Sequence, residues 1–507
     1  MVRHGRLSKG CQTCRKRKIK CDQALPSCSQ CRKAGWVCPQ YGDAVERMFL
    51  HQDTDSFKRQ QKGPCREAQI LRPAEEALTR TYRDGCQIAL WNDVPDEIRQ
   101  SVNDRAIEYF LLTHTFRDDG ALRGFYEYLP TYGDIQADKE LLTMLTATAL
   151  AAFGNRFKHA DILKQARHYY GRSLRLVNRA LQSPIKARRD STMISILLLN
   201  TFEGLTSEGR SSMVYSDGHM RGELMIMSLR GPSLMASRLG MQLFLHMCRC
   251  LITYCTIRPA HVPAEVIELR KHAAKLLDTN SPAWVLEEIM IKLANFRADV
   301  KDDGILGDPR RVIDSALQLD NEILNFSNNI PHEWRFTVHD SKQSPETRTL
   351  TYYHVYPDLW VAYTWNYIRA CRLLLHKEVK NQFGKSVDDL GLLSAEALRF
   401  RQHSSQTVHQ LVLDICASVP QYCDGLSTRT SHCTKSLPVT KEHAASPVPT
   451  IAGVYFLIWP LWTAGDTTQS LARRDWIIKN CRSIGQMTGI QRMRTVAESM
   501  ERGEYFV

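Results

Sequence analysis

The 507-residue sequence has no apolar run long enough for a membrane-spanning helix, which argues against an integral membrane protein. Its most apolar stretch, residues 451–465, is too short to span and contains Pro460, so we expect a buried helix there. The first ten residues are basic and polar, which predicts no export signal and therefore a reducing compartment. In that compartment clustered cysteines are expected to bind metal rather than form disulfides.

Motifs of catalysis are also absent: there is no phosphate-binding glycine loop, nucleophile elbow or metalloprotease motif. His219 lies close to Asp217 and Glu223, but this arrangement fits the start of a helix with a capping aspartate. Three cysteines of an apolar stretch have no histidine at ligand spacing and are expected to be buried thiols: Cys248, Cys250 and Cys255. We therefore predict that the chain is not an enzyme.

Acidic residues are scarce at the amino-terminal end. Residues 1–40 contain ten Lys and Arg but one acid, Asp22, so they carry +9 of the total net charge of +13. The basic residues alternate with cysteines at metal-binding spacing, which is not typical of a solvated tail. The charge predicts a polyanion as partner.

Six of the sixteen cysteines form a repeat within residues 11–38. The spacing C-x2-C-x6-C occurs twice, seventeen residues apart, and places cysteines at Cys11, Cys14, Cys21, Cys28, Cys31 and Cys38. Three thiolates leave a tetrahedral zinc one ligand short, and six can serve two zinc ions only if two sulfurs bridge both metals. A four-cysteine finger or iron–sulfur cluster would leave two cysteines over. The repeat therefore predicts a Zn2Cys6 cluster.

This stretch resembles the fungal zinc binuclear cluster family of transcription regulators, whose cysteine pattern is present without departure. The resemblance implies two zinc ions bridged by Cys11 and Cys28, the first cysteine of each half. It also implies that Pro26 shapes the loop between the halves, and that the module (residues 8–40) binds double-stranded DNA at CGG-type triplets.

The two halves differ in the residues after their second cysteine. The basic run 15–20 has no glycine or proline, whereas Gly35 is expected to end the second helix early. The sequence thus predicts that only the first half continues as a cationic helix suited to the major groove. Ile19 and Trp36 are expected to pack in the small core of the module.

The resemblance assigns base contacts to Arg17 and Lys18, and phosphate contacts to Arg15 and Lys20. Lys16 could equally be a solvated surface charge. The same Arg-Lys-Arg-Lys run is also typical of a nuclear import signal.

Residues 41–100 are polar and lack the heptads of a coiled coil, so we predict a linker without a dimerisation zipper. A homodimer is possible only through the large region downstream; otherwise the protein binds as a monomer. Residues 101–507 show helical periodicity and no convincing strands, and predict an all-α domain. One helical face is formed by Leu163, Ala166, Tyr170, Leu174, Val177 and Leu181. Residues 331–350 and 425–450 are predicted as loops.

Four stretches resemble, in order, the helical regulatory region of many fungal regulators: 218–232, 358–376, 414–422 and 453–466. Four aromatics are expected to pack in the core, with a ligand pocket as the alternative: Trp360, Tyr363, Trp365 and Tyr367. The sequence as a whole predicts a nuclear, zinc-dependent, sequence-specific regulator of RNA polymerase II transcription that acts with the transcription machinery. The alternatives are a ligand-responsive metabolic sensor and a chromatin or scaffold protein that binds DNA without sequence choice.

Overall fold

The computed structural model describes residues 11, 13–14, 17, 19–22, 24, 27–36, 38, 101–116, 120–133, 135–206, 217–302, 308–341, 350–390, 395–423 and 451–504, with the backbone alone at 217, 384–390, 395–398 and 400. The chain divides into two compact units, Met1–Pro73 and Ala74–Val507. The predicted linker lies outside the described residues up to residue 100, as does the predicted loop 425–450.

The small unit contains helix α2 (Ser29–Lys33), which ends before Gly35 as predicted. Cys28 is its N-cap residue and accepts a hydrogen bond from the Cys31 backbone N–H at 3.4 Å. Gly35 follows the helix with a φ of +65°, a left-handed conformation that glycine adopts without strain.

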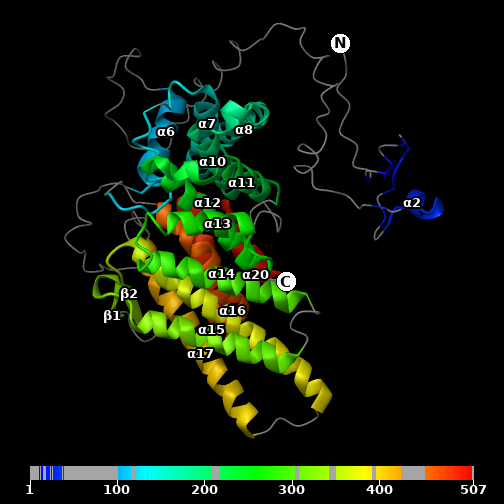
Figure 1. Cartoon of the computed structure of the whole chain (residues 1–507), viewed down its shortest axis with the longest axis vertical. Coiled ribbons are helices and arrows are strands. Elements are labelled where there is room, and N and C mark those ends of the chain that lie inside the picture. The colour runs from blue at the N-terminus through cyan, green and yellow to red at the C-terminus, as the bar shows by residue number, and fades with distance from the viewer. Residues whose placement is uncertain are drawn as a thin grey trace. The chain divides into compact units, whose positions relative to one another are not determined.

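The large unit is helical, which confirms the predicted all-α class (Figure 1). Its α-helices are α6 (Val102–Thr113), α7 (Lys139–Phe157), α8 (Ala160–Leu181), α9 (Pro184–Ala187), α10 (Asp190–Thr206), α11 (Asp217–Arg230), α12 (Arg238–Ile257), α13 (Ala264–Ala273), α14 (Pro282–Lys301), α15 (Pro309–Asn328), α16 (Leu359–Leu390), α17 (Ala395–Cys423), α18 (Ile458–Thr467), α19 (Leu471–Thr488) and α20 (Gln491–Glu501). Short 3₁₀ helices are η3 (Gly231–Ala236), η4 (His332–Trp334) and η6 (Ala452–Leu457).

The helices pack in two groups joined by a central layer (Figure 1). Helices α6, α7, α8 and α10 lie together, α15, α16 and α17 form the other group, and α12 and α14 lie between them. The predicted face of α8 is the face that packs: Ala166, Leu174 and Val177 are buried there. Helix α12 is buried on nearly all sides, and its cysteines are buried free thiols, as predicted.

One predicted loop is wrong in part. Residues 331–350 include η4 and strand β1 (Thr337–Asp340), which pairs antiparallel with β2 (Tyr352–Val355). The register places Thr337 opposite Val355. Strands of four residues are too short to show an alternating pattern in the sequence, and His354 of β2 is buried by packing that depends on the tertiary fold.

The most apolar stretch forms η6 and α18 and is buried, as predicted. Pro460 lies in the first turn of α18, where its missing N–H breaks no helical hydrogen bond. Within the described parts of the chain, no helix has the length and apolar character needed to cross a membrane.

Candidate metal centre and nucleic-acid interface

The structure brings the six cysteines of the repeat together in the small unit. The Sγ atom of Cys11 lies 3.8 Å from that of Cys28 and 3.6 Å from that of Cys31. The Sγ atoms of Cys14 and Cys28 are 3.7 Å apart. Two groups of four sulfurs result, each with all atoms within 4.8 Å: one of Cys11, Cys14, Cys21 and Cys28, the other of Cys11, Cys28, Cys31 and Cys38.

These separations fit tetrahedral zinc. Four sulfurs at about 2.3 Å from one zinc lie roughly 3.8 Å from one another, close to the separations found here. Cys11 and Cys28 belong to both groups, as two bridging sulfurs would. The donor set, thiols alone, also suits zinc rather than a hard cation such as magnesium.

Burial raises the pKa of two thiols in the cluster, those of Cys14 and Cys31. Desolvation, followed by the hydrogen bond with Cys28, raises the pKa of the Cys31 thiol to about 12. Desolvation likewise raises the pKa of Cys14. Zinc must displace these protons to bind, so metal binding is coupled to proton release.

The two halves share one backbone design. The Cys14 N–H points at Cys11 Sγ at 3.5 Å, and the equivalent Cys31 N–H points at Cys28 Sγ at 3.4 Å. In each half, therefore, the first cysteine caps the turn that carries the second. Cys11 and Cys28, whose sulfurs belong to both four-sulfur groups, are therefore also the residues that cap the two turns.

The helical turns of both halves also end in the same way, which corrects the predicted long cationic helix. The Ile19 N–H donates to the carbonyl of Cys14 at 3.0 Å, and the Trp36 N–H donates to that of Cys31 at 2.8 Å. This bond to the fifth preceding residue closes a helix C-terminus, so Ile19 is no longer helical. The described residues of both halves therefore close their turns by the same hydrogen bond, and Ile19 and Lys20 do not continue the first turn as a helix.

Arg17, a predicted base reader, is exposed and stacks on an aromatic ring. Its guanidinium carbon lies 3.9 Å from the centroid of the Trp36 ring. Trp36 packs against the cysteine cluster, as predicted, whereas Ile19 is 39% exposed and is not part of the small core. Lys20 is exposed as well.

Three predicted residues, Arg15, Lys18 and Pro26, lie outside the described residues. Sequence reasoning missed Asp22, whose carboxylate accepts the Ser29 N–H at 3.0 Å and so caps α2. This contact lowers the pKa of the Asp22 carboxyl. The only acid of the basic module is thus used to start its second helix, and no local motif separates it from a solvated charge.

The polar residues around His219 in the large unit form internal contacts. His219 Nε2 lies 2.7 Å from Glu203 Oε1, and Glu203 also accepts the Tyr170 hydroxyl at 2.9 Å. Glu223 instead accepts a hydrogen bond from Asn200. These contacts join α8, α10 and α11, so the residues around His219 act in packing.

Three of the four aromatics of α16 are buried in the core, as predicted, and Trp365 is half-buried and packs against it. Trp360 and Tyr363 are stacked with centroids 4.8 Å apart, and Tyr367 packs edge-on against Trp459 at 4.6 Å. Arg249 of α12 lies over the Trp360 ring at 4.5 Å. This contact ties α12 to α16 across the centre of the unit.

Fold and site together define a chain with a cysteine-rich zinc module and a helical domain, and comparison with known families agrees. Residues 9–47 match the fungal Zn(2)-Cys(6) binuclear cluster domain, and residues 133–256 match the fungal specific transcription factor domain. The chain therefore contains a zinc cluster domain and a helical domain of the kinds found in fungal transcription factors, with two zinc ions as cofactor of the first domain. These are regulatory domains rather than enzyme domains.

One curated relative is transcription activator AMTR1 of Alternaria alternata, which is 31% identical over 113 residues. The matched region is 22% of this chain and 12% of the relative, so the chain spans only a small part of the relative's length. No solved structure matches the chain significantly.

Proposed function

We propose that the protein is a nuclear, sequence-specific regulator of RNA polymerase II transcription whose DNA-binding module is folded by two zinc ions. The ligands are Cys11, Cys14, Cys21, Cys28, Cys31 and Cys38, with Cys11 and Cys28 bridging. The observation that carries the proposal is the pair of four-sulfur groups sharing two sulfurs, set in an amino-terminal region, residues 1–40, of net charge +9. A cluster of this charge and size is suited to hold a short basic element against the DNA backbone.

In this proposal Arg17 and Lys18 contact the edges of bases in a CGG-type triplet, while Arg15 and Lys20 contact phosphates. The exposure of Arg17 and Lys20 supports these roles. Stacking on Trp36 leaves the N–H groups at the edge of the Arg17 guanidinium available, and a guanidinium edge matches the O6 and N7 acceptors of guanine.

Metal content tests the first part of the proposal. The zinc-loaded full-length protein should contain two zinc ions per chain by elemental analysis. A Cys11→Ser variant should hold less zinc than a Cys255→Ser variant, which removes a buried thiol of α12 and serves as the control. One zinc ion or none in the unaltered protein would overturn the shared-sulfur arrangement.

Binding-site selection from randomised DNA tests the second part, and the symmetry of the selected site also reports whether two copies bind. We expect enrichment of a CGG-type triplet. Arg17→Ala should then weaken the selected site by about 1–3 kcal/mol more than random DNA. Arg32→Ala, which removes an exposed arginine from the second half, is the matched control.

Equal weakening of selected and random DNA by Arg17→Ala would move Arg17 to the phosphate contacts. Failure to enrich any sequence would favour the alternative of a scaffold that binds DNA through its charge alone.

A further inference from the structure

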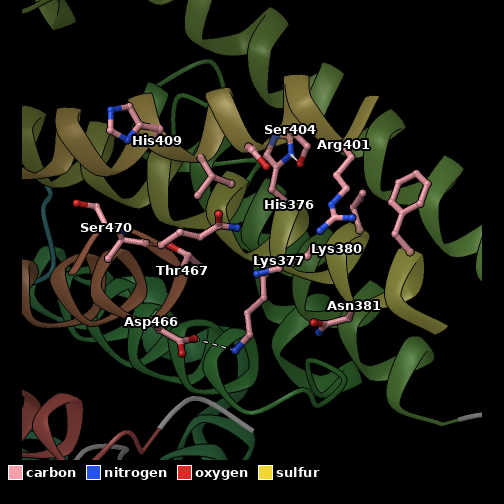
Figure 2. Close-up of a pocket in the computed structure, with 16 residues that line it drawn as sticks. His376, Lys377, Lys380, Asn381, Arg401, Ser404, His409, Asp466, Thr467 and Ser470 are labelled. Carbon is pink, nitrogen blue, oxygen red and sulfur yellow. Dashed lines mark hydrogen bonds and ion pairs between the residues drawn. The ribbon is translucent and has the colours of Figure 1, made fainter. Parts of the chain in front are cut away.

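The large unit contains a cavity of about 640 Å³ between α16, α17 and the segment that joins α18 to α19 (Figure 2). Its volume is in the range of pockets that bind small molecules. The cavity lies outside the region matched by the transcription factor domain, residues 133–256. Neither the metal centre nor the packing of the core gives it a role.

Each of the two helices turns one face to the cavity. From α16 come His376, Lys377, Val379, Lys380, Asn381 and Phe383, and from α17 come Arg401, Ser404, Ser405, Val408 and His409. The spacings of three and four residues place the α17 set on one face of its helix, while the α16 set covers a broader face. The cavity is thus a groove between two helix faces rather than a gap at one loop.

The charges of the lining are unbalanced. Lys377, Lys380 and Arg401 face one acid, Asp466. Lys377 Nζ lies 2.7 Å from Asp466 Oδ2, and the Asp466 side chain is 3% exposed, so these two charges neutralise each other (Figure 2). Lys380 and Arg401 are exposed and make no ion pair with any side chain that the structure describes. Two positive charges therefore remain for a ligand.

His376 of α16 forms part of the cavity lining that also carries Lys380 and Arg401. His376 is buried, and its Nδ1 lies 2.8 Å from the Ser404 hydroxyl, which links α16 to α17. Its Nε2 faces Asp320, 3.6 Å away, on α15. Asp320 is also held by Arg372 at 2.7 Å, so this acid is engaged behind the groove.

The rest of the lining supplies both apolar and polar contacts. Val379, Phe383 and Val408 offer apolar surface, and the segment 466–470 contributes threonine and serine hydroxyls. Ser470 is the N-cap of α19, an 18-residue helix whose amino-terminal end carries a partial positive charge. The groove therefore combines an apolar wall with positive charge and hydroxyl groups.

We propose that this groove binds a small organic anion carrying a carboxylate or phosphate group. Lys380 and Arg401 bind the anionic group, and Val379, Phe383 and Val408 contact its carbon skeleton. The proposal does not depend on the DNA-binding function; together with it, the chain would be a regulator that senses a metabolite.

Calorimetric titration of the zinc-loaded full-length protein without DNA tests this proposal. The probes are inorganic phosphate, glucose 6-phosphate and citrate, each at the same ionic strength, and they separate phosphate from carboxylate recognition. We expect at least one probe to bind, and the double variant Lys380→Ala/Arg401→Ala to bind it about tenfold more weakly or worse.

The matched control is Lys164→Ala/Arg175→Ala, which removes the same charge from exposed positions of α8. It should bind the probe like the unaltered protein. An equal loss in both double variants would mean a general effect of net charge and would overturn the proposal, as would the absence of binding by all three probes.

A third variant tests the groove without changing its charge. Ser405 is exposed on the cavity wall, and Ser405→Trp should fill the cavity and abolish binding, while circular dichroism shows an intact helical unit. Unchanged binding by this variant would place the anion elsewhere on the surface and overturn the assignment.

Discussion

Trp36 and Arg17 lie in different halves of the cysteine repeat, yet their side chains meet at 3.9 Å. Trp36 is anchored against the cysteine cluster, so it can restrict an arginine that would otherwise be free in solvent. The expected benefit is a smaller loss of side-chain entropy when Arg17 binds DNA. Trp36 is therefore a positioning residue in the proposed interface.

Trp36→Ala should weaken binding to the selected DNA site about two- to fivefold, the range expected for an exposed cation–π contact of about 0.5–1 kcal/mol. Trp36→Phe, which keeps an aromatic face, should restore much of the affinity. Zinc content should be unchanged in both variants. The role assigned to Trp36 fails if Trp36→Ala and Trp36→Phe weaken DNA binding equally. It also fails if Trp36→Ala weakens binding as much in the Arg17→Ala variant as it does in the protein that keeps Arg17.

Glu223 shows how burial changes a single residue. It is fully buried with Asn200 as its hydrogen-bond donor, and burial raises the pKa of its carboxyl well above the usual range. The carboxyl therefore keeps its proton to a higher pH in the folded protein than in the unfolded chain, where it ionises above about pH 4.3. Its contribution to stability is complete below that pH and is lost as the pH rises.

Glu223→Gln should therefore stabilise the protein, and the gain should increase with pH. Glutamine keeps an acceptor for Asn200 and does not titrate, so the difference should grow by up to about 1.4 kcal/mol per pH unit from about pH 5 until the pH reaches the raised pKa of the folded state. Urea unfolding of both proteins at several pH values in this range measures it. A gain that does not vary with pH would show that Glu223 is ionised in the fold.

At the scale of elements, the end of α19 is held by a backbone position that needs glycine. Gly489 has a φ of +77°, and an added Cβ would lie 2.8 Å from the backbone nitrogen of Arg156 at the end of α7. Gly231, after α11, has a similar φ of +57° but has nothing within 4 Å of an added Cβ. Substitutions at Gly231 and Gly489 therefore separate the energetic cost of a left-handed backbone conformation from the cost of a close contact.

Gly231→Ala should cost about 1 kcal/mol of unfolding free energy, the penalty of a left-handed conformation. Gly489→Ala should cost about 1–3 kcal/mol more, because α19 and α7 must also move apart. Urea unfolding of the two variants provides the comparison. Equal costs would mean that α19 has room to shift away from α7.

Some elements of the structure can be predicted from the sequence, and others cannot. The cluster is predictable because its cysteine spacing is local, and α8 because its apolar stripe is long. The end of the first helical turn is not predictable from the sequence, because nothing in the run 15–20 breaks a helix. The hydrogen bond from the Ile19 N–H to the Cys14 carbonyl depends on where the cysteine cluster holds the chain. The groove is equally hidden, because Lys380, Arg401 and Asp466 converge from three distant segments.

At the scale of the whole molecule, the two units have very different cores. The large unit buries a continuous apolar core, whereas the fully buried side chains of the small unit, within its described residues, are Cys11, Cys14, Cys28 and Cys31. Such a core is too small to fold the module by itself. The energy that folds it must come from metal binding.

Removal of zinc with a strong chelator should therefore abolish DNA binding while the large unit stays folded. The helical circular dichroism signal and its thermal transition should change little, because nearly all described helices belong to Ala74–Val507. Zinc added back should restore DNA binding. Survival of DNA binding in fully zinc-free protein would contradict the role of the metal.

The shared backbone of the two cysteine halves has a further consequence for how such a protein can be re-engineered. Both halves cap and close their turns by the same hydrogen bonds. The side chains after the second cysteine of each half, rather than the backbone, therefore distinguish the half proposed to contact DNA. If the residues after Cys14 contact DNA as proposed, exchanging them with the residues after Cys31 should move the DNA contacts to the second half while the six cysteines keep their places in the sequence.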